Sequence, residues 1–274
     1  MSRKLSLTGL GTTCFWYGNN PKAENTIVRA VSEYGITTID TAEMYGYGRC
    51  EEAVGKIIKR CGRENLCIID KILPSHCTKK TFERSLNTSL ERLGTDYIDY
   101  YLLHWRENTD LHFMIAAMEH AVKEGKILHW GVSNFDTDDM QDLLACRDGE
   151  KCTVDQILYN PLTRGPEYDL IPYLHSHHIL PMSYSSLGIS GSNRRRFTEH
   201  PVIRQIAEKE HVSPEGIMLA FNIRNKDLCA VFSTTSIDHL KQDMTWKEFD
   251  IQPYMNMINR YFPSPDHKVP LEKY

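Results

Sequence analysis

The sequence lacks the features that mark membrane, secreted and nucleic-acid-binding proteins. No apolar run approaches the roughly 20 residues that a membrane-spanning helix needs. The first residues, MSRKLSLTGLGTTCFW, carry charge but have neither a long apolar core nor a small-residue cleavage site, so we read no signal peptide. A net charge of −4 argues against a surface that binds nucleic acid as a whole. We therefore expect a cytoplasmic protein without a membrane or nucleic-acid partner.

Two further absences concern metals and cofactors. The eight cysteines include no CxxC pair, which removes the usual zinc and thioredoxin signatures, so we expect free thiols and no metal site. No G-x-G-x-x-G segment follows a strand-like run, so a Rossmann dinucleotide-binding domain has no support.

What the sequence does contain is a persistent alternation of strand-like and helical patterns. Helical patterns such as 21–35, which follows Asn20 as a helix cap and ends at Gly35, separate the strand-like runs. Such alternation implies parallel strands joined by right-handed crossovers. It predicts one α/β domain over residues 1–274, a (β/α)8 TIM barrel with its active site at the C-terminal ends of the strands. The eight strand-like runs are 5–13, 36–40, 66–71, 97–104, 127–133, 153–160, 179–185 and 229–234.

Ionisable side chains stand where several of these predicted strands end. Asp40 ends a β-branched run, Lys71 and His104 each follow apolar strand residues, and Tyr45 lies on a glycine-rich turn. In a barrel the C-terminal strand ends open onto one pocket, so these groups are expected to meet. A lysine beside a phenol lowers the pKa of that phenol, and an aspartate keeps the lysine charged and in place. Tyr45 would then act as a general acid, with His104 orienting the substrate oxygen.

Each of these residues also has an ordinary structural interpretation when taken alone. A lysine at a strand end is most often a surface residue, and a histidine after an apolar run is most often a hydrogen-bonded core residue. Asp40 and Tyr45 alone fit a turn aspartate and a surface tyrosine. The cluster His175, His177 and His178 ends a helical pattern at the opposite side of the barrel and is expected to be structural rather than a metal site.

Six segments, in this order, resemble the aldo-keto reductase family: GITTIDTAEMYGYGRCEEAVGK, IIDKI, DYIDYYLLHW, GVSNF, VDQILYNPL and MSYSSLG. The resemblance implies a barrel that binds a nicotinamide dinucleotide without a Rossmann fold. It places the family's catalytic tetrad on Asp40, Tyr45, Lys71 and His104. It places cofactor contacts on Gly11, Thr12, Thr13, Asp40, Ser133, Asn134, Gln156, Tyr184, Ser185, Leu187, Ser233, Thr234, His239 and Gln242. Among these, Ser133, Asn134 and Gln156 would hold the carboxamide, and Tyr184 would stack on the nicotinamide ring.

The sequence departs from the family where a lysine and an arginine hold the 2′-phosphate of NADP in many members. Ser233 and His239 stand at those positions, which removes two charge-assisted contacts. A run of arginines at 194–196 either replaces the lost cations or forms a solvated loop. The sequence favours NADP(H) and leaves NAD(H) open. Asp70, beside Lys71, is a second departure, and strand alternation points it away from the tetrad towards a helix.

Three functions are weighed, in decreasing order of support. The first is NAD(P)H-dependent reduction of aldehydes or ketones, with Tyr45 as the proton donor. The second is a regulatory protein that binds the dinucleotide but has little turnover, and the third is a barrel lyase or isomerase. The substrate would be a small-molecule carbonyl, and a monomer is the default expectation. The expected pocket walls are Phe15, Trp16, Tyr47, Trp105 and the C-terminal segment 251–274.

Overall fold

The protein folds into a closed barrel of eight parallel strands that follow one another in sequence order, with β8 paired to β1. This is the predicted (β/α)8 TIM barrel. The computed structural model describes residues 5–273. The strands are β1 (Thr8–Gly11), β2 (Thr38–Asp40), β3 (Cys67–Ile72), β4 (Ile98–Leu103), β5 (Ile127–Ser133), β6 (Val154–Leu158), β7 (Leu180–Tyr184) and β8 (Cys229–Phe232). Each begins and ends within three residues of its predicted limits.

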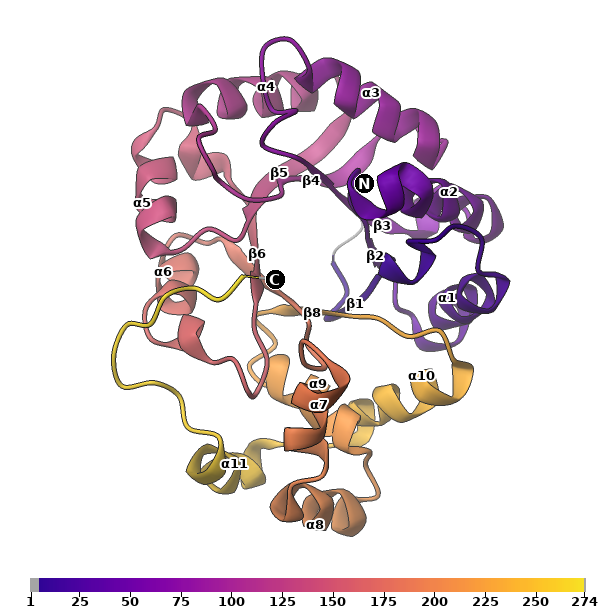
Figure 1. The fold of residues 1–274 in the computed structure, drawn as a ribbon, viewed down its shortest axis with the longest axis vertical. Helices are drawn as coiled ribbons and strands as arrows, with labels where there is room; N and C mark the ends of the chain where they lie inside the picture. Colours follow the sequence, from indigo (N-terminus) through magenta and orange to yellow (C-terminus); the bar gives the residue numbers. More distant parts are fainter. Residues whose placement is uncertain (1–4, 274) are drawn as a thin grey trace.

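Helices surround the barrel as an outer ring (Figure 1). Most crossovers carry a single helix, but three helices, α7, α8 and α9, lie between β7 and β8. The arginine run 194–196, for which a solvated loop was one of two interpretations, belongs to α7. The helices are α1 (Pro21–Tyr34), α2 (Arg49–Cys61), α3 (Phe82–Leu93), α4 (Leu111–Lys123), α5 (Thr137–Ala145), α6 (Leu170–Ser176), α7 (Gly191–Thr198), α8 (Pro201–Glu210), α9 (Pro214–Asn222), α10 (Ile237–Asp243) and α11 (Met255–Tyr261).

Local signals in the sequence explain where several helices begin and end. The side chain of Asn20 accepts a hydrogen bond from the backbone N–H of Ala23 at 3.1 Å and so caps α1. Gly35 ends the same helix in the left-handed conformation. Asp110 caps α4 and Asp136 caps α5 in the same way as Asn20. These contacts satisfy backbone donors that the first turn of a helix leaves without partners.

Side chains of the strands alternate between the barrel interior and the helix layer. In β3, Ile69 belongs to the small apolar cluster inside the barrel, while Ile68 and Ile72 belong to the larger cluster between barrel and helices. Lys71 therefore points inward, and Asp70 points towards the helices, as predicted. This alternation places one lysine at the centre of the barrel mouth and its acidic neighbour behind it.

The C-terminal part of the chain passes the loop after β6 and the beginning of α5, which follow the ends of β6 and β5. Arg164 donates a hydrogen bond to Asn259 on α11 at 2.8 Å and another to the backbone oxygen of Phe262. Further on, Lys268 pairs with Asp138 on α5 at 2.9 Å. That this segment lies near the pocket, and that the whole of 1–274 is one domain, stay predictions; residues 1–4 and 274 lie outside the described residues.

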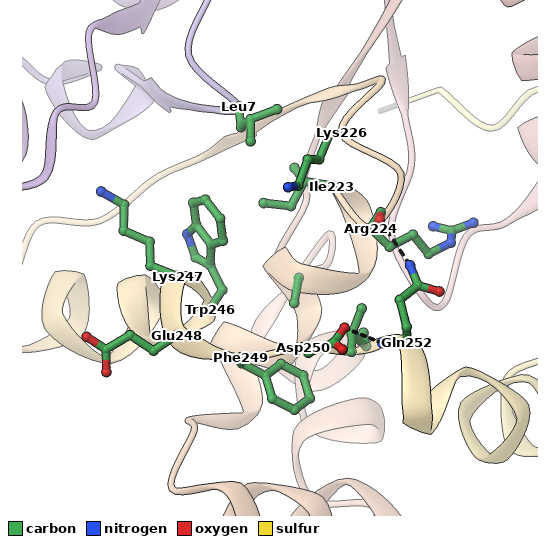
Figure 2. Close-up of a pocket in the computed structure, with 12 residues that line it drawn as sticks. Leu7, Ile223, Arg224, Lys226, Trp246, Lys247, Glu248, Phe249, Asp250 and Gln252 are labelled. Carbon is green, nitrogen blue, oxygen red and sulfur yellow. Dashed lines mark hydrogen bonds between the residues drawn. The ribbon is translucent and has the colours of Figure 1, made fainter.

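All eight cysteines are free. Within the described range 5–273, no helix combines the length and the apolar character needed to cross a membrane. A cavity of about 650 Å³ lies where residues preceding β1 and β8, such as Leu7 and Lys226, meet the segment 246–252 (Figure 2). Its lining comes from the side where these strands begin, so it lies away from the predicted catalytic residues.

Candidate active site

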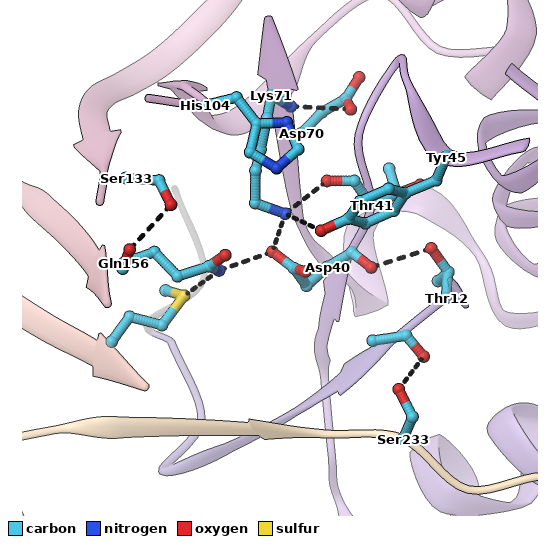
Figure 3. Close-up of polar contacts among 12 residues, drawn as sticks. Thr12, Asp40, Thr41, Tyr45, Asp70, Lys71, His104, Ser133, Gln156 and Ser233 are labelled. Atoms are coloured by element: carbon cyan, nitrogen blue, oxygen red, sulfur yellow. Dashed lines mark hydrogen bonds and ion pairs between the residues drawn. The ribbon is translucent and has the colours of Figure 1, made fainter. Parts of the chain in front are cut away.

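Asp40, Lys71 and Tyr45 meet at the C-terminal ends of the strands (Figure 3). Asp40 is the last residue of β2, and Lys71 lies near the end of the neighbouring β3. The Lys71 ammonium is 2.8 Å from Asp40 Oδ1, 2.8 Å from the backbone oxygen of Thr41 and 3.4 Å from the Tyr45 hydroxyl. Lys71 is fully buried and Asp40 nearly so. The ammonium thus joins a carboxylate and a phenol, which is the arrangement that the sequence predicts.

His104 completes the group from the end of β4. Its ring lies edge-on to the ring of Tyr45, with 5.7 Å between ring centroids. Burial, together with the nearby charge of Lys71, lowers the pKa of His104 to about 3. The imidazole is therefore neutral at neutral pH, and it can take part in hydrogen bonds but cannot serve there as a cationic acid.

The charge state of Lys71 results from opposing effects. Burial alone would lower the pKa of its ammonium, but Asp40 and Tyr45 outweigh burial and raise that pKa. The lysine is therefore a permanent cation in the barrel mouth at physiological pH.

The pKa of Tyr45 differs from the expectation. Burial of the phenol raises the pKa above its ordinary value and outweighs the lowering by Lys71, while Asp40 raises it further. The predicted net lowering is therefore wrong, because the sequence did not show that desolvation of the phenol outweighs the charge of Lys71. The consequence is that Tyr45 holds its proton at neutral pH.

A tight turn positions Tyr45. Gly46 follows it with a φ of +58°, and a Cβ atom placed there would lie 2.5 Å from the backbone oxygen of Trp16. Only glycine fits this contact without movement of the backbone. Tyr47, predicted to line the pocket, instead points to solvent and is 83% exposed. Phe15 is also not a wall residue, because it is buried in the core between barrel and helices.

A cavity of about 460 Å³ opens above these residues. Trp16 and Trp105 line it as predicted, and none of the described residues 251–273 does. Of the predicted site residues, the following line this cavity: Gly11, Thr13, Asp40, Tyr45, His104, Ser133, Asn134, Gln156, Tyr184, Ser185, Leu187 and Ser233. The catalytic and carboxamide-binding candidates are therefore brought together in one place.

The polar side of the cavity is a connected set of amides and hydroxyls. Asn134 accepts a hydrogen bond from the Tyr184 hydroxyl at 2.7 Å and donates one to the backbone oxygen of His104 at 3.0 Å. Gln156 donates to Asp40 Oδ1 at 2.7 Å. Ser133 donates to the backbone oxygen of Gln156 at 2.8 Å. These contacts hold the amide side chains in fixed positions beside the charged group.

A second cavity of about 350 Å³ adjoins the first and shares Thr13, Leu187, Arg194 and Ser233 with it. Ser233 donates a hydrogen bond to the backbone oxygen of Gly11 at 3.2 Å, which joins β8 to β1 at the boundary. The predicted residues Thr234, His239 and Gln242 line the second cavity. Thr12 lines neither cavity; its hydroxyl is buried and donates to the backbone oxygen of Asp40 at 3.0 Å.

Several lining residues were not predicted from the sequence. Met44 and Ile189 add apolar surface to the first cavity. Of the three successive arginines, Arg194 lines both cavities, and neighbouring Arg195 and Arg196 are exposed. A prediction of α7 would have shown that Arg194 lies on a different face of the helix from its two neighbours. The Thr41 contact to Lys71 uses a backbone oxygen and leaves no signal in the sequence.

Asp70 forms a buried acid pair on the outer side of β3. One oxygen accepts a hydrogen bond from the backbone N–H of Lys71 at 2.8 Å. Its carboxyl group also meets that of Glu51, which is fully buried and pairs with Arg92 at 2.8 Å. Two carboxyl groups can hydrogen-bond only if one keeps a proton. Burial, and then the charge of Glu51, raise the pKa of Asp70 well above its usual value.

The histidine cluster lies away from this site. His175 is 3.7 Å from a carboxylate oxygen of Asp227, next to β8. In the part of the chain that the structure describes, no group of three or more histidine, cysteine or acidic side chains is arranged to hold a metal ion.

Comparisons with known proteins bear on this geometry. A profile of the aldo/keto reductase family matches residues 8–257. Methylglyoxal reductase YeaE of Escherichia coli (strain K12) is 34% identical over 99% of this chain and 96% of its own. Glyoxal reductase of Bacillus subtilis (strain 168) is 29% identical over 92% of each chain. A crystal structure of an aldo/keto reductase from Klebsiella pneumoniae, in complex with NADP and acetate, is 37% identical over 98% of this chain and 96% of that one, with a TM-score of 0.92.

Proposed function

The chain belongs to the aldo/keto reductase family, and from that premise we propose that it reduces a small aldehyde or ketone with NADP(H), with Tyr45 as the proton donor. It is an oxidoreductase, as its relatives are. The observation that carries the specific proposal is the contact of the buried Lys71 ammonium with both Asp40 and the Tyr45 hydroxyl.

The two adjoining cavities fit a dinucleotide. Their volumes of about 460 and 350 Å³ are each in the range of small-molecule sites, and four shared residues make them neighbours. Ser133, Asn134, Gln156 and Tyr184 would hold the nicotinamide half, because hydroxyl and amide groups match a carboxamide. A bound nicotinamide cofactor supplies the hydride that carbonyl reduction needs.

Tyr45 would supply the proton. A carbonyl oxygen that becomes an alkoxide needs an acid that is still protonated at neutral pH, and the raised pKa of the buried phenol meets that need. Lys71 would stabilise the phenolate that remains after transfer, since its ammonium lies 3.4 Å from the hydroxyl. Asp40 holds the lysine in place and charged. Neutral His104 would orient the carbonyl oxygen through a hydrogen bond.

The substrate would be a small carbonyl compound of the kind that names the relatives, such as a short α-oxoaldehyde. The walls beside Tyr45 are Trp16, Met44 and Trp105, which are apolar over most of their surface. Such walls suit a small molecule with little charge.

The test measures turnover of 4-nitrobenzaldehyde and of methylglyoxal with NADPH, in the wild type and in Tyr45→Phe. We expect a loss of at least about 100-fold in kcat for Tyr45→Phe, the lower end of the usual range for a lost general acid. Tyr47→Phe is the matched control, because Tyr47 is two residues away but exposed. Equal turnover in wild type and Tyr45→Phe would remove Tyr45 from its role, and no turnover in the wild type would remove the reductase proposal.

A further inference from the structure

The second cavity has an unusual charge inventory. Its ionisable lining groups, within residues 5–273, include two carboxylates, Glu215 and Asp243, one permanent cation, Arg194, and one histidine, His239. A thiol, Cys14, completes the ionisable groups, and its pKa is raised by burial to about 11. Two carboxylates and one arginine give this cavity no excess of positive charge, so its charge alone does not attract an anion.

Arg194 is held so that it faces both cavities. Its Nε donates to the backbone oxygen of Leu187 at 2.9 Å, which fixes the root of the guanidinium. Among the described residues no carboxylate forms an ion pair with Arg194, and its side chain lines both cavities. Arginine presents a planar fork that matches a phosphate.

Asp243 lines the same cavity and carries a carboxylate, the opposite charge to Arg194. Its residue is 4% exposed, and it makes no side-chain cap contact with the short helix that follows it. Within the described part of the chain, its carboxylate has no hydrogen-bond or ion-pair partner in contact. Glu215 on α9 adds a second negative group to the same wall.

If the first cavity holds the nicotinamide half of the cofactor, the adjoining cavity is the place for the adenosine half. NADP and NAD differ in this half alone, by a phosphate in place of the ribose 2′-hydroxyl. In dinucleotide sites generally, a carboxylate favours the hydroxyl and an arginine favours the phosphate. This cavity contains both kinds of group.

We propose that Arg194 and Asp243 are the opposed specificity-determining residues of this cavity, Arg194 attracting the 2′-phosphate of NADP and Asp243 disfavouring it. The proposal rests on the proposed function, since it assigns the end of the cofactor that lies away from Tyr45. Arg194 would then take over from the cation that Ser233 does not provide. NADP(H) binds, but with a selectivity over NAD(H) that Asp243 limits.

The opposition has a pH dependence with a definite sign. Burial, aided by the charge of Glu215 and opposed by that of Arg194, raises the pKa of Asp243 to about 7. Asp243 therefore gains its charge as the pH rises through neutrality, and selectivity for the phosphorylated cofactor falls. Ionisation of the phosphate itself, near pH 6, acts in the opposite direction by strengthening its attraction to Arg194. His239, on the same helix, also lines this cavity, and the experiment tests it separately.

The experiment measures the dissociation constants of NADPH and NADH by quenching of intrinsic fluorescence at about pH 6.5 and about pH 8.5, on either side of neutrality. The ratio of the two constants is the readout, because it cancels contacts that both cofactors share. In the wild type we expect the preference for NADPH to fall about three- to tenfold over this range, the effect of one unit charge in a partly solvated pocket. Asp243→Asn, which keeps the shape, should abolish that fall and restore the preference at the higher pH. His239→Gln should leave the fall in place.

Arg194→Gln should weaken NADPH binding about 10- to 100-fold, the range for a lost charge-assisted hydrogen bond, and change NADH binding less than about threefold. Arg194→Lys keeps the charge but not the forked donor geometry. Its affinity for NADPH should lie between those of the wild type and Arg194→Gln. Arg195→Gln is the matched control on the exposed side of α7. If Arg194→Gln weakened the binding of NADPH and NADH equally, or if the ratio of their dissociation constants in Asp243→Asn were the same as in the wild type, this inference would be overturned. The proposed function would stand. If the wild type binds neither cofactor, the proposed function falls with it.

Discussion

The ammonium of Lys71 lies 2.8 Å from the carboxylate of Asp40, although neither side chain is open to solvent. Removal of one partner would leave the other as an uncompensated buried charge, which costs about 3–5 kcal/mol of unfolding free energy. We therefore expect Asp40→Asn and Lys71→Met each to destabilise the protein by about that amount and to abolish turnover. The double variant should be less destabilised than the sum of the two, since it leaves no lone charge. Urea unfolding measures all three.

The exposed pair Arg29–Glu33 on α1 is the control for this prediction. Arg29→Met should change the unfolding free energy by less than about 1 kcal/mol, as is usual for a surface pair. If Lys71→Met were as mild as this control, the pair would not be buried in the way described.

His104 predicts a loss of stability in acid. The unfolded chain takes up a proton near pH 6.5, but the folded protein does so only near pH 3, because burial opposes the charge. Stability from this residue is complete above pH 6.5 and is lost as the pH falls towards 3. Between neutral pH and about pH 4.5, His104→Gln should lose about 2 kcal/mol less unfolding free energy than the wild type. The same substitution at exposed His112 is the control, and equal losses in all three proteins would contradict the prediction.

The acid pair of Asp70 and Glu51 predicts the opposite sign. The folded protein keeps a proton on the pair that the unfolded chain releases above about pH 4, so stability falls as the pH rises from there. In Asp70→Asn the amide donates to Glu51 without needing that proton. We expect this variant to exceed the wild type by about 1–2 kcal/mol at about pH 8, and by less at about pH 5. Asp238→Asn, on the surface of α10, should show no such difference, and an Asp70→Asn protein weaker than wild type at about pH 8 would refute the idea.

Gly46 predicts a coupling between backbone and chemistry. Gly46→Ala would place a Cβ 2.5 Å from the Trp16 carbonyl and also strain a left-handed residue. Gly94→Ala, at φ +64°, would meet nothing within 4 Å and carries the conformational strain alone, about 1 kcal/mol. We expect Gly46→Ala to cost clearly more in melting temperature and to reduce kcat, since Tyr45 must shift, while Gly94→Ala keeps full turnover. Equal effects on turnover would mean that the turn does not set the position of Tyr45.

Much of the fold, and the meeting of the candidate catalytic residues, could be predicted from the sequence. The β-branched run before Asp40 and the glycines that end α1 and α3 are local signals, and local geometry followed from them. The convergence of Asp40, Lys71 and Tyr45 needed only the rule that parallel strands in a barrel end at one mouth.

The remaining features depend on distances between elements. The pKa of Tyr45 was predicted with the wrong direction because desolvation depends on the complete pocket. Tyr47 and Phe15 were assigned to the pocket from composition, but backbone conformation turned one outward and packing buried the other. Arg194 could be separated from its neighbours only once α7 was known.

The contact between Ser233 and Gly11 joins the last strand to the first across 222 positions of the chain. Both cavity walls at this boundary therefore form only when the barrel has closed. During synthesis, a chain that has been made only as far as β7 has seven of the eight strands but lacks the cavity wall that contains Ser233. Cofactor would bind the finished barrel and not its precursors, and by mass action it would shift the balance towards closure. Binding of the cofactor would therefore indicate that β8 has paired with β1.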